Sequence, residues 1–107
     1  MKTARPIPRR LLPDNMLVFE TREDGTFRKG KLIRNVRFER EATVSDEEHR
    51  ADTITGTIYV DAMNTRRAYE IPVGSRIEIG GMEVWVKKVE RFEGTRGKIH
   101  HWELSVQ

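Results

Sequence analysis

The feature that most constrains the fold of this chain is the alternation of apolar and polar residues in its last third, residues 72–106. Residues two apart in a β-strand point to the same face, so such alternation gives a strand one apolar and one polar face. Three runs show it: Ile77 and Ile79; Met82, Val84 and Val86; and Trp102, Leu104 and Val106. Gly80-Gly81 separates the first two runs, and glycine accepts the positive φ of a tight hairpin turn. We therefore predict a hairpin followed by a third strand, with Trp102 facing the core.

Four further segments predict strands, at residues 15–21, 31–39, 54–62 and 67–73. The first is apolar on both faces, which predicts burial on both sides. The inward faces expected for the others are, in turn, Leu32, Val36 and Phe38; Ile54, Gly56, Ile58, Val60 and Ala62; and Tyr69, Ile71 and Val73. Turn residues, such as those of Asp24-Gly25, Asn64-Thr65 and Pro72-Val73-Gly74, separate the segments. The pattern predicts an all-β fold: a small single-domain β-barrel or sandwich of about six to seven short antiparallel strands.

The length fits one domain spanning residues 1–107. The high content of charged residues suits contacts with other chains. Apolar residues make up 36% and charged residues 35% of the sequence, and there are no cysteines. Residues 1–37 carry ten basic and four acidic residues, a net charge of +6, whereas residues 38–53 carry two and six, a net charge of −4. Patches of opposite sign suit contacts between subunits. No apolar run has the ~18 residues of a membrane span, so we expect no membrane association.

Residues 1–13 predict an extended N-terminal arm. The prolines within it lack a backbone donor and disfavour helix for the residues before them. A frayed terminus is one interpretation, because chain ends are often poorly ordered. Docking on a neighbour is the other, because exposed leucines gain from burial. The candidate interface residues are Arg5, Arg9, Arg10, Leu11 and Leu12.

Residues 40–53 are highly charged and show no strand alternation. Ser45 with Glu48 three residues later resembles a helix capping box. No apolar stripe would hold such a helix against a core, so the sequence favours a mobile polar loop.

No residue set predicts catalysis, a cofactor or a metal. His100 and His101 are adjacent, and adjacent strand residues face opposite ways, so both could bind one metal only across a bulge. The carboxylates of Asp46, Glu47 and Glu48 are typical of a solvated loop, and the glycines form no phosphate-binding motif. We therefore expect a protein that is not an enzyme.

A small nucleic-acid-binding barrel, of the oligonucleotide-binding or SH3-like kind, is the alternative. The chain has 20 basic residues, and several aromatic side chains could stack on bases: Phe27, Tyr59, Tyr69, Trp85 and Phe92. However, 17 acidic residues are interleaved with the basic ones. The aromatic residues also follow strand alternation, which favours packing in a core or an interface.

Five segments together resemble one known family, with matching order and spacing over nearly the whole chain. They are RPIPRRLLP at residues 5–13, NVRFE at 35–39, TIYVDAMN at 57–64, VGSRIEIGGMEVWVKKVE at 73–90 and HHWELSV at 100–106. This pattern is similar to the minor capsid, or head-completion, proteins of tailed phages and prophages, of the head–tail stopper type.

The resemblance implies a small β-barrel subunit made in the bacterial host cytoplasm and located at the head–tail junction of the virion. Copies would form a ring beneath the portal and adaptor proteins and contact a tail-completion protein. DNA would pass nearby without sequence-specific binding. In such a ring we expect the arm to contact a neighbour. We expect the loop, with Asp46, Glu47, Glu48, His49 and Arg50, to face the DNA channel.

Overall fold

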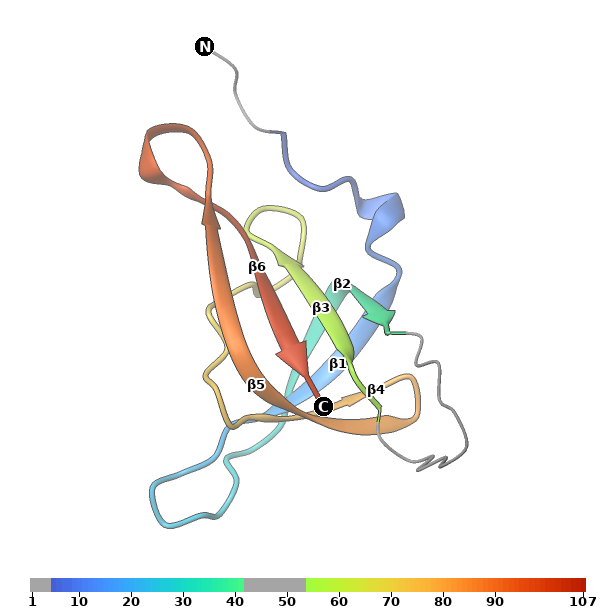
Figure 1. The fold of residues 1–107 in the computed structure, drawn as a ribbon, viewed down its shortest axis with the longest axis vertical. Helices are drawn as coiled ribbons and strands as arrows, with labels where there is room; N and C mark the ends of the chain where they lie inside the picture. The colour runs from blue at the N-terminus through green and yellow to red at the C-terminus, as the bar shows by residue number, and fades with distance from the viewer. Residues whose placement is uncertain (1–4, 42–53) are drawn as a thin grey trace.

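The protein is a closed six-stranded antiparallel β-barrel, as Figure 1 shows. The computed structural model describes residues 5–41 and 54–107. The strands are β1 (Asp14–Phe19), β2 (Lys31–Arg40), β3 (Gly56–Asp61), β4 (Arg76–Ile79), β5 (Met82–Glu93) and β6 (Ile99–Val106), and they close in the order β1-β2-β3-β6-β5-β4. Two 3-10 turns, η1 (Arg9–Leu11) and η2 (Thr95–Gly97), complete the elements. Neither turn, nor any other helix of the described residues, could cross a membrane. The predicted all-β class is confirmed.

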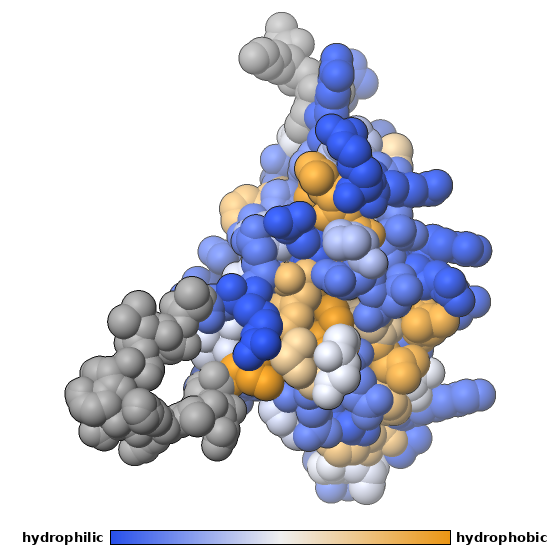
Figure 2. All heavy atoms as spheres, turned by 90° about the vertical axis from the view of Figure 1, so that its right-hand side faces the viewer, coloured by the Kyte–Doolittle hydropathy of each residue, from blue (hydrophilic) through white to orange (hydrophobic). Residues whose placement is uncertain are grey.

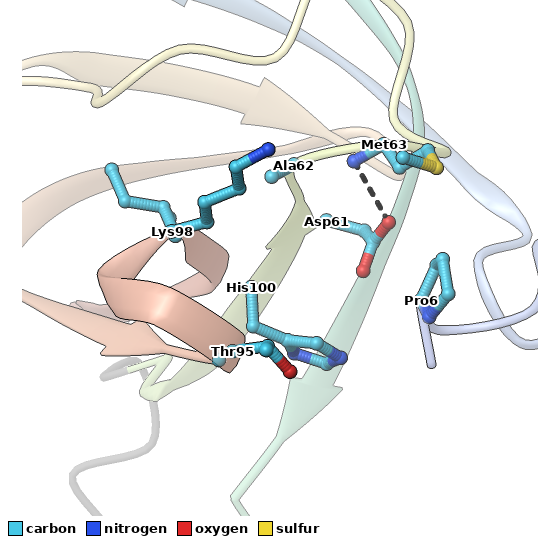
Figure 3. Close-up of a pocket in the computed structure, with 9 residues that line it drawn as sticks. Pro6, Asp61, Ala62, Met63, Thr95, Lys98 and His100 are labelled. Carbon is cyan, nitrogen blue, oxygen red and sulfur yellow. Dashed lines mark hydrogen bonds between the residues drawn. The ribbon is translucent and has the colours of Figure 1, made fainter. Parts of the chain in front are cut away.

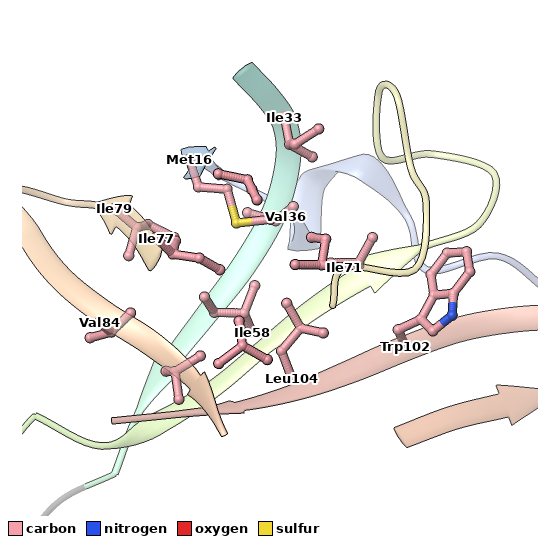
Figure 4. Packing of buried hydrophobic residues seen from close by; sticks show 14 residues of the cluster. Met16, Ile33, Val36, Ile58, Ile71, Ile77, Ile79, Val84, Trp102 and Leu104 are labelled. Carbon is pink, nitrogen blue, oxygen red and sulfur yellow. The ribbon is translucent and has the colours of Figure 1, made fainter. Parts of the chain in front are cut away.

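The hairpin of the last third forms as predicted. Gly80 and Gly81 have φ of 58° and 77° and join β4 to β5. Trp102 is 6% exposed. The long strand β5 pairs with β4 through Met82–Trp85 and with β6 from Val86 onward, so it bends from one neighbour to the other and helps to close the barrel. Figure 4 shows the core that results.

The faces predicted for the first two strands need correction. Leu17 is 36% exposed, so β1 is buried on one face only. In β2, Ile33 is buried instead of Leu32, whereas Val36 is buried as predicted. The cause is Asn35, which has a φ of 63° and is an extra residue opposite β1, where the register shifts. Such a bulge reverses which alternate residues face the core.

The segment 67–73 is not a strand. It belongs to the connection of residues 62–75, which pairs with β2 only through an isolated bridge between Arg34 and Arg66. Arg67 has a left-handed φ of 66° and Pro72 has no N–H, so no ladder continues. The connection nevertheless contributes Ile71, which is fully buried among the strands (Figure 4). Val73 is 62% exposed.

Tyr69 links the same connection to the end of β1 and the start of β2. Its hydroxyl donates to Glu20 Oε2 at 2.6 Å, and Lys31 Nζ lies 3.0 Å from that oxygen and 4.6 Å from the tyrosine ring centroid. Burial, followed by the hydrogen bond to the Glu20 carboxylate, raises the pKa of Tyr69 well above its usual value. The phenol is therefore held in its neutral form.

This raised pKa predicts a loss of stability at alkaline pH. In the unfolded chain Tyr69 ionises at a lower pH than in the folded protein. Its contribution to stability is therefore fully present below the unfolded pKa of about 10 and is lost as the pH rises towards the pKa of the folded protein. The free energy of unfolding should fall by up to about 1.4 kcal/mol per pH unit in that range. Denaturant titrations at several pH values would measure the slope. In the Tyr69→Phe variant the free energy of unfolding should fall less steeply with pH. An unchanged dependence on pH would contradict the assignment to Tyr69.

Candidate functional site

The carboxylate of Asp61, the last residue of β3, accepts three backbone N–H groups. It is fully buried. Its Oδ1 accepts the backbone N–H of Ile7 at 2.9 Å, and its Oδ2 accepts those of Met63 at 3.0 Å and Asn64 at 2.8 Å. Figure 3 shows Asp61 between the turn after β3 and the N-terminal arm. One side chain therefore both forms a turn and holds the arm.

Asn64 makes a second hydrogen bond to the arm. Its Nδ2 donates to the carbonyl oxygen of Ile7 at 2.8 Å, so both backbone groups of Ile7 are bound by side chains of one turn. Thr65 supports this turn because its Oγ1 accepts the Asp61 N–H at 2.8 Å and donates to the Asn35 carbonyl at 2.6 Å. These hydrogen bonds use only the backbone of Ile7, so they do not depend on its side chain.

A second contact fixes the arm two residues earlier. His100 Nε2 lies 2.5 Å from the carbonyl oxygen of Arg5, and His100 Nδ1 lies 2.8 Å from His101 Nδ1. The two rings meet although the residues are adjacent, because β6 has an extra residue at His100, where the register with Phe92 and Glu93 shifts. Such a bulge redirects a side chain. We call Asp61, Asn64 and His100 the arm clamp.

The partners of the histidine pair fix one of its hydrogen-bond directions. A carbonyl oxygen only accepts, so His100 Nε2 donates to Arg5, while the two Nδ1 atoms share one hydrogen bond whose direction depends on the tautomers. His101 Nε2 lies 2.9 Å from Glu103 Oε2, and a carboxylate also accepts. The ring of His101 stacks on Phe92 with centroids 4.7 Å apart.

Among the predicted interface residues, Leu12 has a different place from the rest. It is fully buried in the barrel, and its carbonyl oxygen accepts from Asn35 Nδ2 at 3.4 Å. Leu12 is therefore a core residue of its own subunit, which corrects its assignment to an exposed interface. Leu11 is 42% exposed, and Arg5, Arg9 and Arg10 are also exposed. The arm is extended except at η1, where Leu11 N and Leu12 N donate to the carbonyls of Pro8 and Arg9, both at 2.9 Å.

A mainly apolar cavity of about 330 Å³ lies beside the clamp (Figure 3). The arm, the turn after β3 and the hairpin between β5 and β6 form its walls; the lining residues include Pro6, Ala62, Met63, Lys98, Ile99 and His100. Met63 is 72% exposed at this position. Lys98 brings an ammonium group to this otherwise mainly apolar lining.

Sequence reasoning missed the clamp. Asp61 and Asn64 lie in the VDAMN segment, where an aspartate that ends a strand is followed by an asparagine three residues later. Such residues bond nearby backbone N–H groups in turns, and that signal could have identified the turn. The arm as its second partner could not be found, because Ile7 is 54 residues away in sequence. The predicted channel residues, Asp46, Glu47, Glu48, His49 and Arg50, lie outside the described residues and stay a prediction.

The aromatic residues considered for base stacking have partners within the chain. Phe27 packs on Trp85 with centroids 5.7 Å apart, and the Arg76 guanidinium covers the Phe27 ring at 5.1 Å. Tyr59 donates to Glu39 at 3.1 Å. In residues 5–41 and 54–107 no group of three or more potential ligands could hold a metal ion.

The fold and the site together define a small closed β-barrel whose basic N-terminal arm is clamped to its own chain. The comparisons with known proteins give the family. Residues 8–106 match the family model of the minor capsid protein, and the chain belongs to that family. No curated protein and no solved structure matches it. Membership implies a structural component of the phage particle, which is a non-enzymatic type of role.

Proposed function

We propose that this chain is a head–tail connector subunit of the stopper, or head-completion, type. Copies assemble as a ring beneath the portal and adaptor proteins, retain the packaged DNA and join the tail. The observation that carries the proposal is membership of the minor capsid protein family over residues 8–106.

The arm supports a ring because it offers side chains to a neighbour at little cost in entropy. A ring needs two different surfaces that match each other, one on each side of the subunit. The clamp and the buried Leu12 fix the arm backbone from Arg5 onward, while Arg9, Arg10 and Leu11 stay exposed. Figure 2 shows apolar patches among hydrophilic side chains on the face that carries the arm. A fixed arm loses less freedom on binding than a frayed one.

The base of the acidic segment also suits an assembly protein. Glu41 N donates to the Thr55 carbonyl at 2.8 Å, and Thr55 Oγ1 donates to Glu41 Oε1 at 3.0 Å. Glu41, just after β2, and Thr55, just before β3, are therefore held together by hydrogen bonds. β2 and β3 pair as far as Arg40 and Gly56, so the barrel wall is continuous between these two strands.

The test is assembly with capsids that lack this chain. DNA-filled capsids made without it are expected to lose DNA to added nuclease and to lack tails. Purified protein should restore DNA retention and tail joining, and electron microscopy should show added ring density beneath the portal. The charge-reversed variant Arg9→Glu/Arg10→Glu should restore neither activity, whereas the control Lys88→Glu, on the exposed part of β5, should restore both.

Two outcomes would count against the connector. One is a capsid that retains DNA and joins tails equally well without the protein. The other is tight DNA binding by the isolated subunit, with an affinity that falls steeply as salt rises, since that is the behaviour of a nucleic-acid-binding barrel.

A further inference from the structure

A groove on the outer surface of the barrel brings three arginines together. Its lining residues are Leu32 and Arg34 of β2 and Arg66 and Arg67 of the connection between β3 and β4, and its volume is about 330 Å³. Arg66 N donates to the Arg34 carbonyl at 2.9 Å, so the backbone holds the two segments side by side. The groove is separate from the arm clamp, with which it shares no lining residue.

The positive charge of this groove is not compensated within the described chain. Several basic side chains elsewhere on the barrel pair with carboxylates: Lys31 with Glu20, Arg76 with Glu78 and Glu83, and Arg91 with Glu70. Within residues 5–41 and 54–107, none of the ion pairs includes Arg34, Arg66 or Arg67. Like charges gathered in a concave surface attract an anionic group.

The backbone conformation of Arg67 also indicates that this groove has a role. Its φ of 66° lies in the left-handed region, which a side chain with a Cβ disfavours. Glycine would fit that conformation without strain, yet an arginine occupies it at the wall of the groove. Strained residues are concentrated at functional sites, so the outlier supports a binding role for the arginine side chain.

Two exposed leucines add an apolar component to this surface. Leu17 of β1 is the cross-strand neighbour of Leu32, and the two are 36% and 39% exposed on the outer face. β1 is paired on both sides, with β2 and with β4, so no strand edge is open here. A partner must therefore be recognised through side chains: carboxylates for the arginines and apolar groups for the leucines.

We propose that this groove docks an acidic segment of a partner protein, one that carries carboxylates next to apolar side chains. Guanidinium groups bind carboxylates in a fixed, often bidentate geometry, and the leucine pair gains from being covered. A nucleic-acid backbone would satisfy the arginines but leave the leucines in water. The surface therefore favours a protein partner, and the groove would serve the subunit whether or not it forms a ring.

The experiment is a titration of the isotope-labelled full-length protein with a short synthetic peptide that alternates glutamate and leucine, followed by NMR. The same peptide with glutamine in place of glutamate and a short DNA duplex are the comparison ligands. Amide and guanidinium signals of Leu32, Arg34, Arg66 and Arg67 are expected to shift with the acidic peptide, whereas those of the ion-paired Arg91 stay in place.

Matched variants connect the shifts to the groove. Arg34→Gln/Arg67→Gln should raise the Kd for the acidic peptide by about five- to tenfold, as expected for partly exposed charge pairs. It should not lower the melting temperature, because it removes repulsion between like charges. Leu17→Ser/Leu32→Ser should also weaken peptide binding, and Lys88→Gln should not.

Three results would overturn the inference. One is no shift of the groove signals with the acidic peptide; another is equal binding of the glutamine peptide. The third is tighter binding of the DNA duplex through the same arginines with no effect of the leucine variant, which would assign the groove to nucleic acid. Because the capsid assay measures DNA retention and this titration measures peptide binding, either proposal can fail without the other.

Discussion

Replacing Asp61 with alanine is expected to lower the free energy of unfolding by about 3–5 kcal/mol and to detach the arm. The change removes the acceptor of three backbone N–H groups, those of Ile7, Met63 and Asn64, at a fully buried position. Each donor left without a partner costs about 1–3 kcal/mol. A loss of this size is a large share of the stability of a small domain. Denaturant unfolding followed by circular dichroism measures it.

Detachment of the arm has its own measurement. Trypsin cleaves after arginine, and the exposed Arg9 and Arg10 lie in the arm, so cleavage there reports how often the arm opens. Asp61→Ala should speed this cleavage under conditions where the barrel is still folded. Asp61→Asn keeps one acceptor oxygen and should give an intermediate rate.

Asp24 provides the control because it makes similar bonds on the surface. Its Oδ1 accepts the backbone N–H of Thr26 at 3.0 Å and the Thr26 hydroxyl at 2.6 Å in an exposed turn. Asp24→Ala should lower stability far less than Asp61→Ala, since water can replace the lost partner. Equal losses for the two variants would show that burial and the arm contact of Asp61 contribute nothing.

Replacing Ile71 with alanine is the second change with a large expected effect. The side chain is fully buried in the barrel although its residue lies in a connection without strand structure. Removing a buried isoleucine side chain down to the Cβ costs about 2–5 kcal/mol, part of it for the cavity left behind. Thermal and denaturant unfolding both measure the loss.

Val73 is the matched control, two residues further along the same connection and 62% exposed. Val73→Ala should change the free energy of unfolding by no more than about 0.5 kcal/mol, as surface substitutions usually do. If Ile71→Ala were equally mild, the connection would not be part of the core. The difference between the two variants therefore tests whether residues 62–75 contribute to the core of the barrel.

The sequence predicted well where local signals were consistent. Alternation over β4, β5 and β6, with Gly80-Gly81 between the first two, predicted the hairpin and the inward faces. It also predicted that Trp102 faces the core, because a strand with a period of two leaves one face apolar.

Prediction failed where one residue changed the geometry of its neighbours. The positive φ of Asn35 inserts a bulge into β2, so Ile33 is buried and Leu32 lies outside. A bulge at His100 likewise brings its ring against His101. Alternation assumes an unbroken pleat and cannot show where the register shifts, since that depends on the strand alongside.

Local patterns in the sequence were enough to predict the class of fold, the hairpin, the core residues of the last three strands and the division of charge between arm and loop. How the arm is held and where the groove lies became visible only in the folded barrel. The Asp61–Ile7 contact joins residues 54 positions apart, and the three arginines come from two segments that one backbone bridge holds together. Local patterns specify strands and turns, because these depend on neighbours in sequence. Contacts between distant segments form only when the barrel closes, and no local period records them.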